Sequence, residues 1–255
     1  MSALVKAVRA LAAAVSFLTV LPVAGRVSLD GTDVARGSVL FPLVGAAIGA
    51  VSGSVAWALG DAVPPLLAAV LAVALGAAVT GALHLDGLAD FADSFGGHTP
   101  EDRLRIMRDH TIGTYGATAL LLDLLVRVSA LAALAGTRDA LLFSVAAATL
   151  ARTGGPLLSV MLPYAQARPG AGEALNADPS QPRAAVALGI GGLITFFVLD
   201  PSTAQYATSL ATAAAVLVVV AWAARRRLGG VTGDVMGASS ELVEIAVLAA
   251  LVALL

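Results

Sequence analysis

Residues 37–60 read GSVLFPLVGAAIGAVSGSVAWALG and residues 62–83 read AVPPLLAAVLAVALGAAVTGAL, with Asp61 as the only charged residue between them. Each run reaches the roughly 20 apolar residues that a helix needs to cross about 30 Å of hydrocarbon. Two such runs in succession predict a helical hairpin through a membrane. The whole chain agrees, because 58% of its 255 residues are hydrophobic and only 13% are charged, whereas about 25% are charged in soluble domains.

Further apolar runs extend the prediction beyond this hairpin. A third charge-free run covers 201–224, and weaker runs cover 112–135, 139–162, 184–199 and 237–255. About seven crossings then account for most of the chain. We therefore expect an all-α, polytopic integral membrane bundle of about seven transmembrane helices that forms one domain over residues 1–255. Residues 5–24 fit an interfacial or re-entrant helix better than a span, because a span would move Lys6 and Arg9 to the side that has few basic residues.

The arginines sort by side when these spans are counted. Basic residues favour the cytoplasmic side of a membrane, and the loop after the first hairpin, residues 84–111, carries Arg103, Arg105 and Arg108. The other basic segments lie an even number of spans away, so all of them face that side: Arg26, Arg36, Arg168, Arg183, Arg225, Arg226 and Arg227. Only short links around Asp61, Arg138 with Asp139, and Asp200 face the other side.

An acidic cluster opens this cytoplasmic loop. Residues 84–93 read HLDGLADFAD, so that on a helix Asp86, Asp90 and Asp93 would share one face. Three like charges at this spacing repel one another, and Mg²⁺ prefers carboxylate oxygens. The pattern predicts a metal site at the membrane edge, although a solvated helix end is the simpler alternative. By the same count of spans, Asp109, Asp234 and Glu241 lie near the same side and are expected to converge there.

The rest of the loop adds groups that suit phosphate. Gly96 and Gly97 are expected to break the acidic helix, and Thr99 followed by Pro100 should begin a new one that runs to about Asp109. On it Arg105 and Arg108 share a face. The turn at 112–116, IGTYG, contains glycines that let backbone amides approach an anion. Carboxylates, guanidinium groups and such a turn together favour a diphosphate site.

Charge and composition exclude other classes of partner and chemistry. The formal net charge is −2, which gives no basis for nucleic-acid binding. The absence of cysteine excludes disulfides and thiol catalysis. Asp123 with Arg127, and Arg152, fall inside predicted spans, where ionisable residues are functional candidates by default. A buried pair of Asp123 with Arg127 is the alternative reading. The sequence leaves the oligomeric state open.

Several motifs together resemble the adenosylcobinamide-GDP ribazoletransferases, also called cobalamin 5'-phosphate synthases. The central one is TGALHLDGLAD at 80–90 with Asp93, continued by IMRD at 106–109 and IGTYG at 112–116. Similar features occur at both ends of the chain, in FLTVLP at 17–22, FPLVG at 41–45 and GGVTGD at 229–234 with Glu241 and Glu244. Two positions depart from the pattern, since Arg108 stands where lysine is common and His110 where a small polar residue is common. Arg108 keeps positive character and His110 adds it.

This resemblance implies a multi-pass enzyme of a bacterial or archaeal cell membrane with its active-site loops in the cytoplasm. Such enzymes join α-ribazole, or α-ribazole 5'-phosphate, to adenosylcobinamide-GDP and release GMP, with Mg²⁺ required. On this reading Asp86, Asp90 and Asp93 hold the metal, and Asp109, or else His84, accepts the hydroxyl proton. Substrate contacts are expected from Arg105, Arg108, Gly113, Tyr115 and Asp234.

Two other classes fit part of the pattern. A CDP-alcohol phosphotransferase would also place several aspartates on helices at the membrane edge, but its acids are spaced differently. A transporter would also be polytopic, but the chain has no clear internal repeat and its acids gather in a loop rather than at mid-membrane. Both therefore rank below the Mg²⁺-dependent ribazoletransferase.

Overall fold

The computed structural model describes residues 2–23, 25, 28–109, 111–165, 172–199 and 204–255. Within these ranges the regular structure is helical, apart from a single β-bridge between Tyr164 and Val231. Four residues named in the sequence predictions, Arg26, His110, Arg168 and Asp200, lie outside the described ranges. The all-α prediction is confirmed for the part of the chain that the structure describes.

Every predicted span coincides with a helix of the bundle. The spanning helices are α3 (Phe41–Leu59), α4 (Pro65–Thr80), α7 (Thr114–Leu134), α8 (Arg138–Met161), α10 (Gln181–Val198), α11 (Ala204–Leu228) and α12 (Gly233–Val252). By length and composition, six helical segments are long and apolar enough to cross a membrane alone, and the count is seven if α4 and its bent continuation are taken as one span. The polytopic bundle of about seven helices is therefore confirmed.

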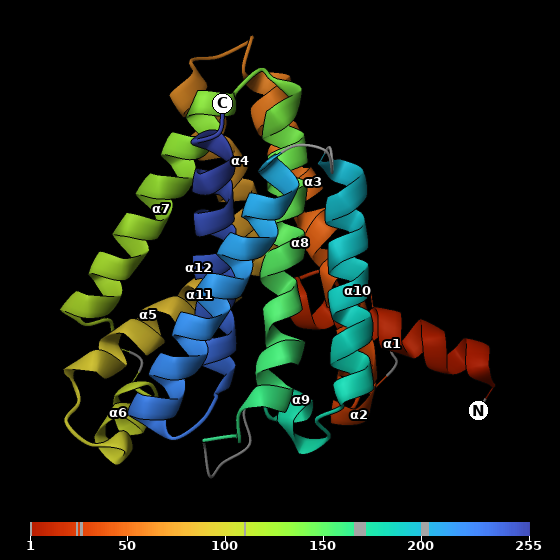
Figure 1. Cartoon of the computed structure of the whole chain (residues 1–255), viewed down its shortest axis with the longest axis vertical. Helices are drawn as coiled ribbons and strands as arrows, with labels where there is room; N and C mark the ends of the chain where they lie inside the picture. Colours follow the sequence, from red (N-terminus) through yellow and green to blue (C-terminus); the bar gives the residue numbers. More distant parts are fainter. Residues whose placement is uncertain (1, 24, 26–27, 110, 166–171, 200–203) are drawn as a thin grey trace.

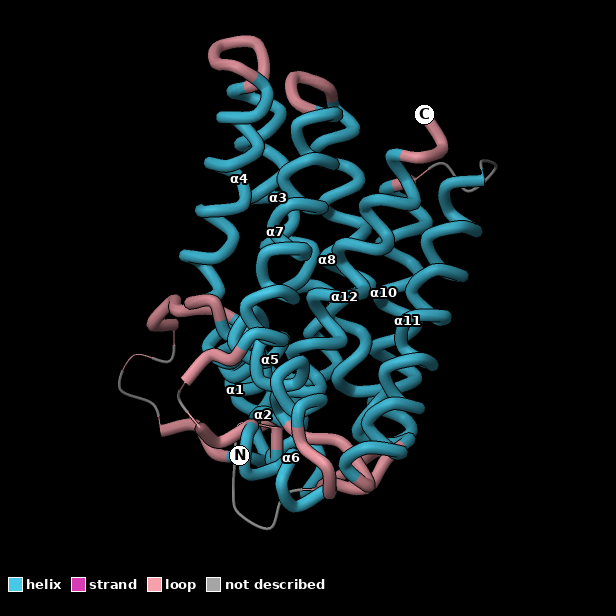
Figure 2. Tube along the Cα trace, turned by 90° about the vertical axis from the view of Figure 1, so that its left-hand side faces the viewer, coloured by secondary structure: helices cyan, strands magenta, loops and turns pink. Residues whose placement is uncertain are grey.

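The short helices gather at one end of this bundle. They are α1 (Ala3–Leu18), α2 (Gly31–Gly37), η1 (Ser38–Leu40), α5 (Leu83–Asp93), η2 (Ser94–Gly96), α6 (Pro100–Ile106) and α9 (Glu173–Ala177). Figure 1 and Figure 2 show the long helices side by side, with these elements at the lower end and α1 lying across the bundle rather than along it. We refer to this end as the polar end. The orientation of α1 agrees with the expected interfacial helix.

Glycines bring α3 and α8 into backbone contact. Gly45, Gly49 and Gly53 follow one another at four-residue intervals on α3 and face α8. A Cβ atom on Gly49 would lie 2.3 Å from the carbonyl oxygen of Ser144, so no larger residue fits without moving a helix. Small residues at this spacing let helices pack closely in membranes, where lipid chains are as apolar as leucine.

The turn between α4 and α5 redirects the chain by 90°. Gly81 and Ala82 both have left-handed backbone conformations, with φ of 60° and 57°. Glycine adopts this region freely, whereas it is uncommon for alanine. The break ends α4 at Thr80 and lays α5, which carries the acidic cluster, along the polar end.

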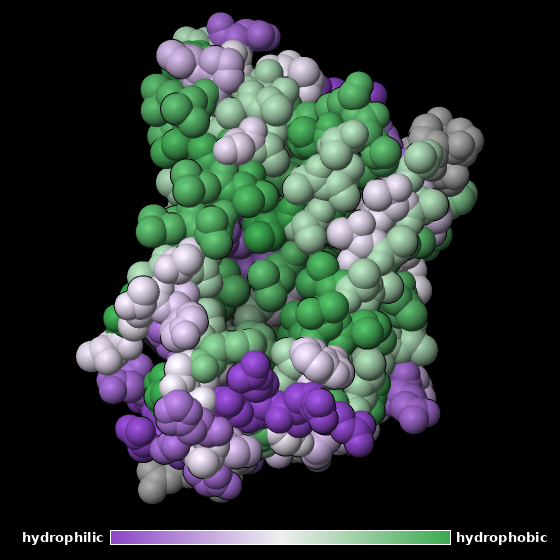
Figure 3. Space-filling view, turned by 60° about the vertical axis from the view of Figure 1, so that its left-hand side comes forward, coloured by the Kyte–Doolittle hydropathy of each residue, from purple (hydrophilic) through white to green (hydrophobic). Residues whose placement is uncertain are grey.

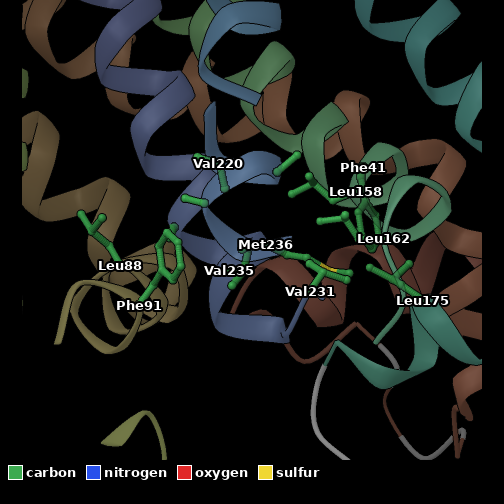
Figure 4. Packing of buried hydrophobic residues seen from close by; sticks show 14 of the residues in the cluster. Phe41, Leu88, Phe91, Leu158, Leu162, Leu175, Val220, Val231, Val235 and Met236 are labelled. Atoms are coloured by element: carbon green, nitrogen blue, oxygen red, sulfur yellow. The ribbon is translucent and has the colours of Figure 1, made fainter. Parts of the chain in front are cut away.

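Surface hydropathy follows the same division. On the face that Figure 3 shows, hydrophobic residues cover most of the middle of the molecule and hydrophilic residues gather at the polar end. Beneath that zone, apolar side chains from several helices pack together, as Figure 4 shows for Phe41, Phe91, Leu158, Val220 and Met236. This cluster fixes α5 and the first turn of α12 against the bundle.

The loop elements match their predicted signals with one correction. The acidic helix passes into η2, which ends at Gly96, as the glycine pair predicts. The Thr99 hydroxyl accepts a hydrogen bond from the Asp102 amide at 3.1 Å and so caps α6. However, α6 ends at Ile106 rather than near Asp109, because Met107 and Arg108 already form a turn. Arg103 extends from α6 to donate to the carbonyl oxygen of Arg227 at 3.2 Å.

Candidate active site

A close crossing of α5 and α12 builds the centre of the site. A Cβ atom on Gly87 would lie 2.8 Å from the carbonyl oxygen of Asp234, and one on Gly237 would lie 3.4 Å from the Cα atom of His84. The two glycines therefore let the start of α12 rest directly on α5. Asp234, at the first turn of α12, is brought beside the acidic helix even though about 150 residues separate them in sequence.

A cavity of about 130 Å³ opens at this crossing. Its polar lining consists of His84, Asp86, Arg152, Tyr164, Asp234 and Ser240. Its apolar lining comes from α1, α3 and α9 and includes Phe17, Leu18, Phe41 and Leu175. We call it the site cavity. Three of the predicted site residues, His84, Asp86 and Asp234, meet in its wall.

The pKa of Asp90 is raised by the negative charge that is concentrated beside this cavity. Burial and the nearby carboxylates of Asp234, Asp86 and Asp93 raise the pKa of Asp90 to about 7. Each of these causes disfavours the ionised carboxyl group. The acidic cluster is therefore real, and it carries more negative charge than the surrounding groups compensate. Within the described residues, however, no three His, Asp or Glu side chains already lie at metal-coordinating separations.

Asp109 and His84 are the two expected proton acceptors, and of these only His84 lines the site cavity. Its side chain is 5% exposed, and its Nδ1 atom has no hydrogen-bond partner among the described residues. Burial, followed by the charges of Arg152 and Arg127, lowers the pKa of His84 well below its usual value. His84 is therefore neutral at physiological pH. Asp109 is exposed and does not line the cavity, and its Oδ1 atom accepts a hydrogen bond from the Thr111 amide at 3.1 Å.

Asp93 has a different partner from the one expected. Its Oδ2 atom accepts a hydrogen bond from the Gly113 amide at 2.7 Å, and its Oδ1 atom accepts one from the Gly116 amide at 2.8 Å. A Cβ atom on either glycine would lie within 2.6 Å of this carboxylate. The amides of the glycine turn thus bind the carboxylate of Asp93, and substrate binding by Gly113 stays a prediction.

The predicted phosphate-binding residues are distributed unevenly. The Arg105 side chain is 75% exposed and ion-pairs with Asp102 at 3.7 Å, so it does not line the cavity. Tyr115 is also exposed and lies beside Gly96 rather than at the cavity. Arg108 is exposed, but it lies close enough to Tyr164 for its charge to act on that phenol. It is therefore the better placed of the two arginines.

Tyr164 is a site residue that the sequence reading missed. Its phenol oxygen is buried without a hydrogen-bond partner among the described residues. Burial and the carboxylates of Asp234 and Glu173 raise its pKa, while Arg108 opposes them. The bridge to Val231 holds Tyr164 at the cavity. The only hint of this in the sequence is that Tyr164 follows Pro163 directly after a predicted span.

A second group of charges lies inside the membrane region. Arg127 ion-pairs with Asp123 at 3.5 Å and with Glu244 at 2.5 Å, and it also pairs with Glu241. Arg152 pairs with Glu244 from the other side. The pair of Asp123 with Arg127, which was the alternative to a functional role, is present in the structure. Glu241 belongs to this network, so its expected convergence with the acidic loop is wrong.

Comparisons with known proteins agree over nearly the whole chain. The sequence model of a family described as cobalamin-5-phosphate synthase matches residues 10–252. A protein of Chlorobaculum tepidum named adenosylcobinamide-GDP ribazoletransferase is 41% identical over 93% of this chain and 92% of its own length. Proteins with the same name from Azorhizobium caulinodans, 41% identical over 92% of each chain, and Ralstonia nicotianae, 38% identical over 99% and 98%, also match. No solved structure gives a significant match.

Proposed function

Because the chain belongs to the cobalamin-5-phosphate synthase family, we propose that it joins α-ribazole, or α-ribazole 5'-phosphate, to adenosylcobinamide-GDP and releases GMP. The products are adenosylcobalamin or its 5'-phosphate, at a late step in assembly of the nucleotide loop. The family match selects this reading over the transporter and the CDP-alcohol phosphotransferase. We place the reaction in the site cavity at the polar end, because His84, Asp86 and Asp234 all line it.

Magnesium fits the donor atoms of this site. Asp86, Asp90 and Asp234 offer hard oxygen ligands, and the raised pKa of Asp90 reflects a local excess of negative charge that a cation would relieve. Mg²⁺ is usually held by one or two carboxylates together with water and substrate phosphates, so three ligands at coordinating separation are not needed beforehand. Asp93 is assigned to the cap of α7 rather than to the ion. When bound, Mg²⁺ would neutralise charge on the diphosphate.

The reaction is a phosphoryl transfer in which the chain positions two substrates. A ribose hydroxyl oxygen of the acceptor bonds to the phosphorus that carries the corrinoid arm, and the bond from that phosphorus to the bridging oxygen of the diphosphate breaks, so that GMP leaves with the electron pair. His84, which is neutral and buried in the cavity, accepts the hydroxyl proton at a ring nitrogen. We assign contacts with the phosphate oxygens of the leaving group to Tyr164, which lines the site cavity, and to Arg108, whose charge acts on the Tyr164 phenol.

The protein is a multi-pass membrane protein, and we place it in the cell membrane with the polar end in the cytoplasm. Support comes from arginines on the elements of the polar end, where Figure 1 shows α2, α6 and the last turns of α11. These arginines are Arg36 on α2, Arg103 and Arg105 on α6, Arg108 just after α6, and Arg225 in the last turn of α11. On α1, Leu4, Val5, Val8 and Leu11 form an exposed apolar face. A helix with such a face lies in the headgroup region, which agrees with its position across the bundle (Figure 1).

Release of GMP by the purified protein tests this proposal. The protein in detergent is given adenosylcobinamide-GDP, α-ribazole 5'-phosphate and Mg²⁺, and GMP is measured over time. We expect release by the unmodified protein and by Asp61→Asn, which changes an exposed aspartate at the opposite end of the bundle. Asp86→Asn should reduce the rate by at least about a hundredfold. Release that ignores chelation of Mg²⁺, or that survives Asp86→Asn, would contradict the assigned site.

A further inference from the structure

Arg152 connects the membrane-embedded charges to the site cavity. It lies on α8, nine residues before the end of that helix at Met161, and therefore about 14 Å inside the bundle. Its side chain is buried, with the residue 3% exposed. Arg152 lines the site cavity together with Asp86 and Asp234, and it also lines the adjoining cavity that contains Arg127 and Glu244.

The charges of the embedded network are divided unequally between its two arginines. Arg127 faces three carboxylates, those of Asp123, Glu241 and Glu244. In the part of the chain that the structure describes, Arg152 forms an ion pair only with Glu244, which it shares with Arg127. The Arg127 guanidinium is thus in direct contact with more carboxylates than the Arg152 guanidinium, which has a single ion-pair partner.

The guanidinium of Arg152 also has an unused donor. Its Nε atom is buried and has no hydrogen-bond acceptor among the described residues. Buried donors in proteins are nearly always satisfied, and an orphaned one calls for a specific partner. Among the described residues lining the site cavity, Arg152 is also the only lysine or arginine. An anion that enters the cavity past Asp86 and Asp234 can therefore pair with Arg152.

We propose that Arg152 binds a phosphate group of the substrate at the inner end of the site cavity, with Glu244 and Arg127 holding its guanidinium in place. This inference depends on the proposed function. Guanidinium forms paired hydrogen bonds with phosphate oxygens, and the free Nε–H is one of its donors. The phosphate has two possible sources, the 5'-phosphate of the acceptor and the diphosphate of adenosylcobinamide-GDP.

Steady-state kinetics of a charge-balanced variant test this role. Arg152→Gln/Glu244→Gln removes one cation and one anion together, so it leaves no new unpaired charge beside Arg127. Arg152→Gln alone is measured in parallel, and Arg138→Gln, an exposed arginine at the other end of the same helix, serves as the control. The KM is determined for adenosylcobinamide-GDP, for α-ribazole 5'-phosphate and for α-ribazole.

The pattern of KM values identifies the bound phosphate. A rise of about 10- to 100-fold in the KM of α-ribazole 5'-phosphate, but not of α-ribazole, assigns Arg152 to the acceptor. A similar rise in the KM of adenosylcobinamide-GDP assigns it to the diphosphate. Unchanged KM values in both variants would overturn the inference, as would failure of both variants to fold, which would give Arg152 a structural role only. If the unmodified protein and Arg138→Gln release no GMP, the proposed function itself fails.

Discussion

Asp93 and Gly116 are joined by a hydrogen bond of 2.8 Å from the glycine amide to the aspartate Oδ1 atom. With the matching bond from Gly113 to Oδ2, the carboxylate at the end of α5 caps the start of α7. The amides at a helix N-terminus lack partners within the helix and attract negative charge. The cap closes the loop between the two helices and ties the acidic helix to a membrane span.

Asp93→Asn should weaken the fold and leave the metal dependence intact. An asparagine in this position keeps one oxygen acceptor but turns an NH₂ group toward a backbone amide, so we expect a loss of about 1 kcal/mol in stability. The measurement is the thermal unfolding midpoint in detergent, taken together with the Mg²⁺ concentration that gives half-maximal GMP release. Asp86→Asn should show the opposite pattern. A large increase in the Mg²⁺ concentration that Asp93→Asn requires would contradict this assignment and indicate that Asp93 binds the metal.

The sequence predicts the bundle well because membrane spans obey a strong and local rule. A hydrocarbon layer requires long apolar helices, so the positions of all seven spanning helices follow from runs such as 37–60 and 201–224. The end of α6 was misplaced because Ile106 and Asp109 differ by less than one helical turn, and helix ends are not strongly encoded.

The site was predicted less completely because its partners come from distant segments. The spacing of Asp86, Asp90 and Asp93 predicts one helical face, and all three do lie on α5. Spacing alone does not reveal that the amides at the start of α7 donate hydrogen bonds to Asp93, so the sequence did not predict this contact. Likewise Glu241 was grouped with the loop by its side of the membrane, whereas its ion pair with Arg127 depends on how α7 packs against α12.

Gly87→Ala should separate the two halves of the site. The new methyl group would lie 2.8 Å from the Asp234 carbonyl oxygen, and this backbone atom can move only if α12 shifts away from α5. We expect GMP release to fall by about tenfold or more, because small displacements of catalytic groups are costly. Gly192→Ala is the matched control, since its methyl group would meet nothing within 4 Å. Equal activity in the two variants would show that the crossing has no role in the site.

Binding of Mg²⁺ should weaken as the pH falls below 7. Without metal the pKa of Asp90 is about 7, so this carboxyl group is mostly ionised at higher pH and mostly protonated at lower pH. Because the metal binds only the ionised form, its affinity should fall by up to about tenfold per pH unit below that value and level off above it. Isothermal titration of the purified protein with Mg²⁺ at several pH values measures this dependence, and proton release should accompany binding near the pKa.

A control variant separates Asp90 from the other acids. Asp90→Asn removes the titrating group, so its Mg²⁺ affinity should be lower at high pH and should vary much less with pH. The exposed Asp61→Asn should titrate like the unmodified protein. A pH-independent affinity in the unmodified protein would mean that Asp90 takes no part in metal binding.

Labelling of single cysteines should show that α6 and the segment between α9 and α10 lie on the same side of the membrane. The chain contains no cysteine, so each introduced thiol is the only target of a membrane-impermeant maleimide. Within the loops at the polar end, Gly97 and Gly172 are poor positions for a cysteine, because a Cβ atom there would lie 2.8 Å from the Arg103 side chain and 2.6 Å from Gly233, respectively. Glu101 and Pro179 are exposed, so Glu101→Cys and Pro179→Cys are better choices.

If the polar end faces the cytoplasm, both introduced cysteines should react only after cells are opened, whereas Arg138→Cys should react in intact cells. Reaction of Glu101→Cys and Pro179→Cys from opposite sides would contradict the arrangement of spans, and reaction of both in intact cells would reverse the orientation while keeping the fold.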